Sequence, residues 1–184
     1  MHSAGTVTPE IEIKALGPSS AVQMMLSEML IEAVANGGSV SFMHPLPPAM
    51  ANSFWENSLA SAARGERIVF GAFDGAALVG TVTLLLDLPP NQPHRAEMAK
   101  MITRISHRHR GIATALLREA ERAAIKRGRW LLVLDTAVDD GASALYERVG
   151  FTLSGVIPEY AFRPCGGLTG TMIYWKRLND AVPG

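Results

Sequence analysis

The stretch that decides the fold is Ser106-His107-Arg108-His109-Arg110-Gly111-Ile112-Ala113-Thr114-Ala115-Leu116-Leu117. A strand-like run, residues 98–105, precedes it, and a helical pattern that ends near Arg127 follows it. Backbone N–H groups at the start of such a helix lack intrahelical partners, and the helix dipole adds positive potential there. This arrangement binds phosphate groups, and Gly111 has no Cβ that would hold a phosphate oxygen away from the backbone. The sequence therefore predicts a phosphate-binding turn between a strand and a helix.

The composition indicates a globular chain. Of its 184 residues, 48% are hydrophobic and 18% are charged, which predicts one well-buried domain over residues 1–184. The formal net charge of zero argues against bulk nucleic-acid binding. The single cysteine, Cys165, excludes an intrachain disulfide and a cysteine-based zinc cluster, and we expect no metal. The most apolar stretch, residues 68–88, is broken by Asp74-Gly75, and we see no signal peptide, so we expect a cytoplasmic protein that does not bind a membrane.

Hydrophobic periodicity predicts, in order, a strand, two helices, a hairpin of two strands, a long strand, a helix, a strand, a short helix and a final pair of strands. Helical patterns fall at residues 21–35, 48–64, 111–127 and 142–149. Strand patterns fall at residues 11–16, 68–73, 76–86, 94–105, 130–134, 151–156 and 168–175. The prolines and the polar and aromatic residues of the irregular stretch 39–48 suit a loop that contacts substrate, although a lone His44 there is more often structural.

The strand expected at residues 94–105 carries polar residues on both of its sides. Strict alternation places Ala96, Met98, Lys100 and Ile102 on one side, and Arg95, Glu97, Ala99, Met101 and Thr103 on the other. Polar residues on both sides are unusual for a central strand. A strand that borders a site would explain the pattern.

Two motifs resemble those of a known family. The spacing Arg108-x-x-Gly111-x-Ala113 resembles the acetyl-CoA signature Gln/Arg-x-x-Gly-x-Gly/Ala of the GCN5-related N-acetyltransferases, the GNAT family. Residues 139–151 read Asp-Asp-Gly-Ala-Ser-Ala-Leu-Tyr-Glu-Arg-Val-Gly-Phe. They resemble the family pattern Asn-x-x-Ala-x-x-Leu-Tyr-x-x-x-Gly-Phe, with Asp139 where the family usually has Asn. The order of the expected strands and helices agrees with the family too.

The resemblance implies an α/β (α+β) GNAT fold. This is a single mixed, mostly antiparallel seven-stranded sheet with helices on both faces and a splay between the fourth and fifth strands. Within the family the chain is most similar to the tabtoxin-resistance acetyltransferases, through Arg95-Ala96-Glu97 and Leu134-Asp135-Thr136 among other segments. The implied activity transfers an acetyl group from acetyl-CoA, as cosubstrate, to a primary amine of a small molecule. That acceptor is expected to be amino-acid-like or antibiotic/toxin-like, and to attack directly through a tetrahedral intermediate.

The resemblance also implies roles for individual residues. The backbone of Met101, Ile102 and Thr103 is expected to pair with the pantetheine arm in the splay. The turn is expected to hold the pyrophosphate through its cofactor-binding residues Arg108, His109, Arg110, Gly111, Ile112, Ala113 and Thr114. Tyr146 is expected to protonate the departing CoA thiolate. Glu97 and Asp135 are expected to accept the proton of the substrate amine.

The chemistry supports these residue types independently. A thioester reacts with a neutral amine, so a carboxylate must accept a proton from the ammonium that predominates at neutral pH. A backbone N–H can stabilise the oxyanion, and a phenol can supply a proton to the thiolate. Each residue also has a structural alternative: a buried helix tyrosine for Tyr146, a solvated or ion-paired strand residue for Glu97, and a turn cap for Asp135. Cys165, in a glycine-rich turn, is interpreted as a bystander.

Three other functions remain as alternatives. A non-catalytic acyl-CoA-binding or sensor domain would use the same fold, and acetylation of protein N-termini would use the same chemistry. A nucleic-acid binder would use the basic turn, although zero net charge and the lack of interleaved aromatic residues oppose it. As partners we expect a small-molecule amine and no nucleic acid, with the chain as a monomer or a homodimer.

Overall fold

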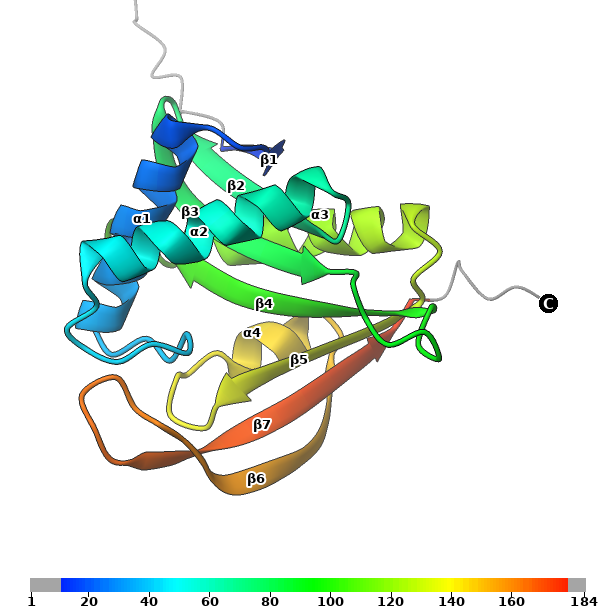
Figure 1. Cartoon of the computed structure of the whole chain (residues 1–184). Helices are drawn as coiled ribbons and strands as arrows, with labels where there is room; N and C mark the ends of the chain where they lie inside the picture. The colour runs from blue at the N-terminus through cyan, green and yellow to red at the C-terminus, as the bar shows by residue number, and fades with distance from the viewer. Residues whose placement is uncertain (1–10, 179–184) are drawn as a thin grey trace, which may run out of the picture.

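The computed structural model describes residues 11–178, whose strands form one seven-stranded sheet in the order β1-β2-β3-β4-β5-β7-β6 (Figure 1). The strands are β1 (Glu12–Leu16), β2 (Arg67–Asp74), β3 (Ala77–Leu85), β4 (Arg95–Thr103), β5 (Leu131–Ala137), β6 (Thr152–Phe162) and β7 (Leu168–Arg177). The helices are α1 (Ser20–Ala35), α2 (Pro48–Ala63), α3 (Ile112–Lys126) and α4 (Ser143–Arg148), with a 3-10 turn at Ile105–His107. None of the helices within this part of the chain is long and apolar enough to cross a bilayer.

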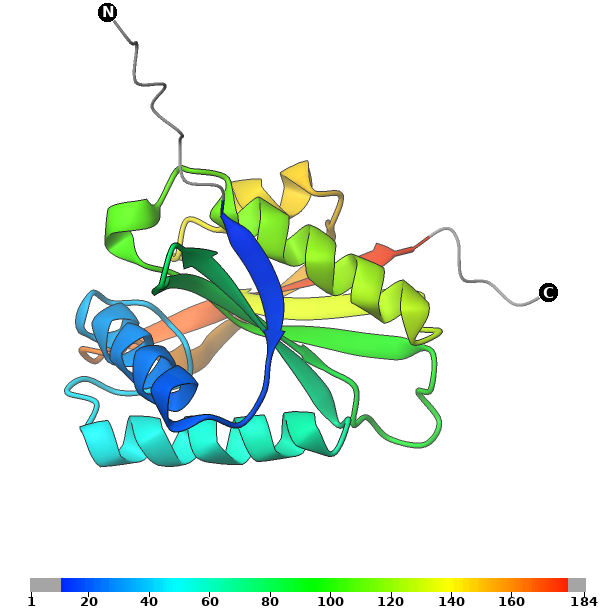
Figure 2. The same cartoon turned by 90° about the horizontal axis from the view of Figure 1, so that it is seen from above.

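The helices cover both faces of the sheet. Figure 2 shows α1 and α2 on one face and α3 and α4 on the other. Two hydrophobic clusters follow from this arrangement. One contains Trp55, Leu30 and Ile102 on the α1–α2 face, and the other contains Leu116 and Leu132 on the α3 face. The predicted seven-stranded sheet with helices on both faces is confirmed.

Strands β4 and β5 are the one parallel pair in the sheet, and they are paired over a short distance only. Their register joins Arg95 with Leu131, Ala96 with Leu132, and Glu97 with Val133. Beyond these residues the strands diverge toward their C-terminal ends, which Figure 1 shows as a widening gap. The predicted splay between the fourth and fifth strands is therefore confirmed. It leaves the edge of β4 from Met98 onward without a β5 partner.

The alternation predicted for β4 is wrong beyond Ala99. Thr81 of β3 pairs with Ile102 and Thr83 pairs with Ala99, so Val82 faces two residues of β4. This β-bulge inserts one residue and reverses the direction of the side chains that follow it. Met98 accordingly packs in the α3-side cluster, whereas Ile102, four residues later, packs in the α1–α2 cluster. Lys100, in the bulge, has a φ of 52°.

Several strand ends also differ from the prediction. β4 ends at Thr103 rather than residue 105, and β5 continues through Asp135 to Ala137. β6 extends to Phe162, although its pattern predicted an end at residue 156. Pro158 lacks the N–H that a central strand needs, but β6 is an edge strand, where proline is tolerated. Bulges within β6 disturb the alternation that would have indicated its full length.

Glu32 of α1 fixes the exit of β4 toward the turn. Its carboxylate accepts hydrogen bonds from Arg104 Nη1 at 2.6 Å and from the backbone N–H of Ile105 at 3.1 Å. Arg104 Nε also donates to the carbonyl of Leu78 at 2.9 Å. One partly buried acid thus joins α1 to the end of β4 and the start of the 3-10 turn. Charge-assisted hydrogen bonds of this kind are among the stronger ones in proteins.

We predict that Glu32→Ala lowers the free energy of unfolding by about 1–3 kcal/mol, because it removes the hydrogen bonds that the carboxylate accepts from Arg104 Nη1 and from the Ile105 N–H. Urea unfolding followed by circular dichroism measures this change. Glu56→Ala on the exposed side of α2 is the matched control and should change stability by less than about 0.5 kcal/mol. Equal effects of the two substitutions would show that the Glu32 contacts do not stabilise the fold.

Candidate active site

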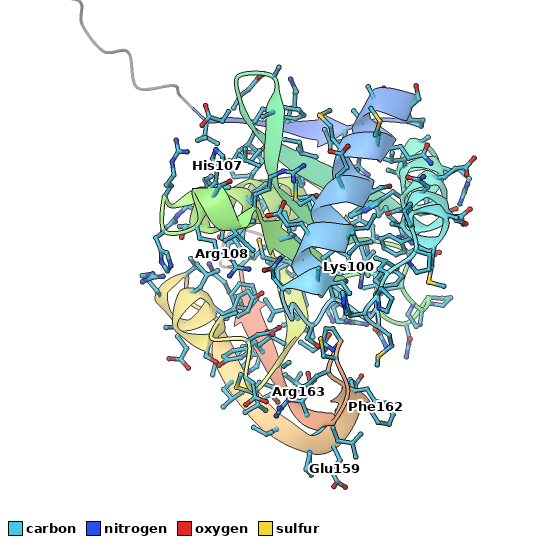
Figure 3. The ribbon with its side chains drawn as sticks, turned by 90° about the vertical axis from the view of Figure 1, so that its left-hand side faces the viewer. Lys100, His107, Arg108, Glu159, Phe162 and Arg163 are labelled. Atoms are coloured by element: carbon cyan, nitrogen blue, oxygen red, sulfur yellow. The ribbon has the colours of Figure 1, made fainter. Side chains whose placement is uncertain are left out.

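The cavity that combines most of the predicted site residues opens at the splay. Its volume is about 510 Å³. Its wall is formed by β4, the end of β5, the turn before α3, helix α4 and the loop between α1 and α2. Figure 3 shows this side of the molecule, with Lys100 near its middle and Arg108 toward α4.

The start of α3 presents backbone donors to this cavity. The first helical hydrogen bond joins the N–H of Ala115 to the carbonyl of Gly111 at 3.0 Å, so the N–H groups of Ile112, Ala113 and Thr114 have no partner within the helix. Gly111 has a φ of 76°, which glycine adopts without the steric cost that other residues meet. These features match the predicted phosphate-binding turn.

Gly80 of β3 allows α3 to begin so close to the sheet. A Cβ at this position would lie 2.9 Å from Ile112 Cγ2 and 3.1 Å from Leu116 Cδ1. Real Cβ atoms rarely approach other atoms that closely, so a larger residue would push the first turn of α3 outward. The glycine therefore helps to set where the unpaired N–H groups lie.

The predicted cofactor-binding residues line the cavity with one exception. Those that line it are Met101, Ile102, Thr103, Arg108, His109, Gly111, Ile112, Ala113 and Thr114. Arg110 is not among the lining residues, because its side chain turns toward the β2–β3 hairpin and pairs with Asp74 at 3.2 Å. His107 Nε2 lies 3.3 Å from Oδ2 of the same Asp74 carboxylate. Unlike Arg110, His107 also lines the cavity.

Tyr146 lies on α4 with its ring buried between Phe151 and Tyr174. The ring centroids are 6.1 Å and 5.8 Å apart, respectively, and the residue is 6% exposed. It lines the cavity, and among the described residues its hydroxyl has no hydrogen-bond partner. Burial raises the pKa of the Tyr146 phenol well above its ordinary value, and the charge of Asp140 adds to this effect. The phenol therefore carries its proton throughout the physiological pH range.

The two predicted carboxylates lie on one face of the sheet but have different surroundings. Asp135 lines the cavity and accepts a hydrogen bond from Thr171 Oγ1 at 3.1 Å. Glu97 does not line the cavity, and its Oε2 lies 3.1 Å from Arg95 Nη1. Glu97 is opposite Val133, so Asp135 lies two residues beyond the last paired position. Side chains two residues apart on a strand point to the same side, so both acids face the α1–α2 side.

The first two residues of the second motif have separate roles. Asp139 contacts the β6–β7 hairpin, where Arg163 Nη2 lies 2.6 Å and Thr169 Oγ1 lies 3.2 Å from its Oδ2. Asp140 lines the cavity instead, and burial raises the pKa of its carboxyl group. Asp139, at the position where the family pattern has Asn, thus forms an ion pair between two loops, outside the cavity wall.

Sequence reasoning missed part of the cavity wall. Ser39, Val40 and Ser41 of the α1–α2 loop line it, as do Lys100, Asp140 and Arg148. The irregular loop was predicted to contact substrate, but its individual residues carry no motif. His44 does not line the cavity, and its backbone N–H donates to the carbonyl of Pro164 at 2.8 Å. Cys165, in the adjacent hairpin turn, is exposed and also lies outside the wall.

Comparison with known proteins agrees with this geometry. The sequence profile of the acetyltransferase (GNAT) family matches residues 31–151. The fold is similar to that of yncA from Salmonella typhimurium, solved with its cofactor acetyl-CoA, with a TM-score of 0.76 at 16% identity, covering 95% of this chain and 98% of that one. It is also similar to a ribosomal-protein-alanine N-acetyltransferase from Brucella melitensis, with a TM-score of 0.75 at 20% identity over 91% and 99% of the chains. For an aminoglycoside 6′-N-acetyltransferase solved with coenzyme A, the TM-score is 0.71 at 16% identity over 94% and 98%.

The mixed sheet with a splayed parallel pair, and the helix N-terminus that faces the splay, agree with the fold of these acetyltransferases. The chain belongs to the acetyltransferase (GNAT) family, and it is an N-acetyltransferase. The similar structures carry names with different acceptors, so the fold does not select the acceptor. Within residues 11–178 there is no group of three or more His, Cys, Asp or Glu side chains arranged to hold a metal ion.

We predict that Gly111→Glu weakens acetyl-CoA binding by about 100-fold or more, because a carboxylate would occupy the anion-binding end of α3 and repel phosphate. A Cβ at Gly111 meets no atom within 4 Å, so the substitution adds no clash, but its φ of 76° costs some stability in any residue other than glycine, and the folded state of the variant is checked by circular dichroism. Isothermal titration calorimetry measures the affinity. Gly128→Glu is the matched control, because Gly128 also has positive φ and open space but lies at the far end of the helix. Unchanged affinity in a folded Gly111→Glu protein would contradict the assignment.

Proposed function

We propose that this protein transfers an acetyl group from acetyl-CoA to the primary amine of a small molecule that is amino-acid-like or antibiotic/toxin-like. One observation carries the proposal. A single cavity brings together the open N-terminus of α3, the unpaired edge of β4, the Tyr146 phenol and the Asp135 carboxylate. A phosphate-binding end and a proton-transfer end in one cleft suit a cosubstrate that is anionic at one end and reactive at the other.

The residues of the cavity fit acetyl-CoA. The N–H groups of Ile112, Ala113 and Thr114 would hold its pyrophosphate, with the Arg108 guanidinium beside them. The backbone of β4 from Met101 to Thr103 would pair with the amide groups of the pantetheine arm, in place of the missing β5 partner. Acetyl-CoA supplies a thioester, an acetyl group already activated for transfer.

Asp135 and Glu97 are proposed to accept the proton that the acceptor ammonium must lose. Asp135 is exposed to the cavity and is held by Thr171, which leaves its second oxygen for the substrate or a water molecule. Glu97 lies on the same face of the sheet, at the last position where β4 pairs with β5. Its ion pair with Arg95 fixes its side chain. Proton transfer from Glu97 through an intervening water molecule is compatible with this position.

Tyr146 is proposed to donate its Oη proton to the departing thiolate. A group with this role must be protonated when the thiolate leaves, and the raised pKa of the buried phenol ensures this. The hydroxyl has no competing acceptor among the described residues. A backbone N–H of the splayed β4 would stabilise the oxyanion.

Further features remain proposals. We infer that within the family the protein is most similar to the tabtoxin-resistance acetyltransferases, that one domain spans residues 1–184, and that the protein acts in the cytoplasm as a monomer or homodimer. An acetyl-CoA turnover screen against amino acids, polyamines, β-lactam amines and peptide N-termini tests the function. CoA release with a small-molecule amine supports it. Tight acetyl-CoA binding without turnover of any amine would favour a sensor domain, and turnover of peptides alone would favour N-terminal acetylation.

We predict that Tyr146→Phe lowers kcat by about 10²- to 10⁴-fold, the usual contribution of a general acid, with little change in acetyl-CoA affinity. Because the pKa of Tyr146 is raised, its phenol does not titrate between about pH 6 and pH 9. The pH profiles of the variant and the wild type should therefore have the same shape, with a lower rate for the variant at every pH. Tyr174→Phe is the control, since Tyr174 is a buried neighbour outside the cavity wall. A wild-type rate in Tyr146→Phe would mean that another group supplies the proton.

We predict that Glu97→Gln and Asp135→Asn have non-additive effects on kcat/KM, because residues that share one proton-transfer function do not act independently. Each single variant should be partly impaired, and the double variant should lose less than the product of the two losses. The value of kcat/KM is measured for the wild type, both single variants and the double variant, each across the acidic limb of the pH profile. Asp139→Asn is the matched control for loss of a nearby carboxylate outside the cavity wall. Additive losses would show that the two acids are not a shared base, and full activity of the double variant would remove both from the mechanism.

A further inference from the structure

The bulge in β4 turns Lys100 toward the side of the splay on which Asp135 lies. Without it, strict alternation would direct Lys100 to the same side as Met98, into the α3-side core. Instead its ammonium donates a hydrogen bond to Ser41 Oγ at 3.0 Å. It also lies 5.6 Å from the ring centroid of Phe54 on α2. A bulge beside an active site commonly re-aims one side chain in this way.

Both residues of this hydrogen bond have unusual backbone conformations. The φ angles are 52° for Lys100 and 73° for Ser41, in the left-handed region that residues other than glycine rarely adopt. Such conformations persist where the surrounding structure determines them, and they are concentrated at functional sites. Here two of them, on a strand and on a loop far apart in the sequence, meet at one hydrogen bond in the cavity wall.

The Lys100 ammonium has no anionic partner in the part of the chain that the structure describes. Among residues 11–178, no carboxylate oxygen lies within 4 Å of its Nζ. An ammonium has three N–H donors, and the hydrogen bond to Ser41 uses one. Burial lowers the pKa of Lys100, while the charge of Asp135 acts in the opposite direction. The remaining donors thus belong to a half-buried cation that lines the cavity.

A lysine in this position is unfavourable for an acceptor that carries only positive charge. The acceptor arrives as an ammonium ion, which Asp135 attracts and Lys100 repels. If the acceptor also carries an acidic group, that group can accept a charge-assisted hydrogen bond from the Lys100 ammonium, which offsets the repulsion. Lys100 then favours one class of amine and opposes the others, which is how interfaces commonly achieve specificity.

We propose that Lys100, held by Ser41, binds the acidic group of the acceptor, so that the substrate is a zwitterionic amine of the amino-acid type. Its ammonium faces Asp135 and its carboxylate faces Lys100. The inference rests on the proposed function and narrows it. A polycationic antibiotic lacks the acidic group, and so does a protein N-terminus, whose α-carboxyl carbon is part of a peptide bond.

A matched substrate panel tests this inference. Each of the L-amino acids is compared with its α-carboxamide and with the amine that lacks the carboxyl group, by measuring CoA release from acetyl-CoA with a thiol reagent. The proteins are the wild type, Lys100→Gln, Lys100→Arg and, as a matched control, Lys126→Gln on the exposed side of α3. For the best acid, calorimetry measures binding to each protein in the presence of CoA, which gives a readout separate from turnover.

We expect the wild type to prefer acids to their carboxamides by about 10- to 100-fold in kcat/KM, the usual effect of a hydrogen bond to a charged group. Lys100→Gln should abolish this preference, mainly by raising KM for the acids and weakening their calorimetric binding. Lys100→Arg should retain part of the preference, and Lys126→Gln should retain all of it.

Three results would overturn the inference. Turnover of carboxamides or simple amines in preference to acids would show that no acidic group is bound. An equal loss for acids and carboxamides in Lys100→Gln would indicate that Lys100 acts on the reaction itself, as a base or through the fold. Lack of turnover for all three substrate classes would contradict the proposed function as well, and this result differs from the first two because no amine reacts.

Discussion

The structure depends on how far two parallel strands stay paired. β4 and β5 share a register from Arg95 to Glu97 and then separate. Pairing at their N-terminal ends holds the two halves of the sheet together, and separation at their C-terminal ends leaves backbone groups of β4 free to bind another molecule. The turn that follows β4 leads directly to the open N-terminus of α3, so one strand connects a backbone recognition surface to a phosphate site.

The side chains of the candidate active site reach the cavity because β4 and β5 separate, and each does so from a different element. Asp135 lies beyond the last residue of β5 that pairs with β4, and Tyr146 reaches the cavity from α4, on the opposite face of the sheet from Lys100. The bulge that places Lys100 lies on β4 next to the gap. The splay therefore gives groups from both faces of the sheet access to one space. Glu32 supports this arrangement from α1, because it fixes the direction in which the chain leaves β4.

Much of the fold could be predicted from the sequence, because glycines and apolar periodicity mark the ends of most elements. The turn at Gly111 and Tyr146 of the second motif, which the sequence assigned to one site, both line one cavity. The bulge could not be predicted, because its residues have ordinary strand propensities and its cause is the register with β3. Lys100 was missed for that reason, and Ser41 was missed because the irregular loop that contains it carries no motif. The direction of Arg110 also depends on Asp74, a tertiary partner 36 residues away.

Hydrogen–deuterium exchange with and without acetyl-CoA tests the central claim, that the splay of β4 and the N-terminus of α3 form one binding surface. The account predicts slower exchange upon binding in two segments, the end of β4 at residues 101–103 and the start of α3 at residues 112–114. The β6–β7 hairpin should exchange at the same rate in both states. Binding of acetyl-CoA that leaves both segments unchanged, or that slows exchange at another edge of the sheet, would contradict the account.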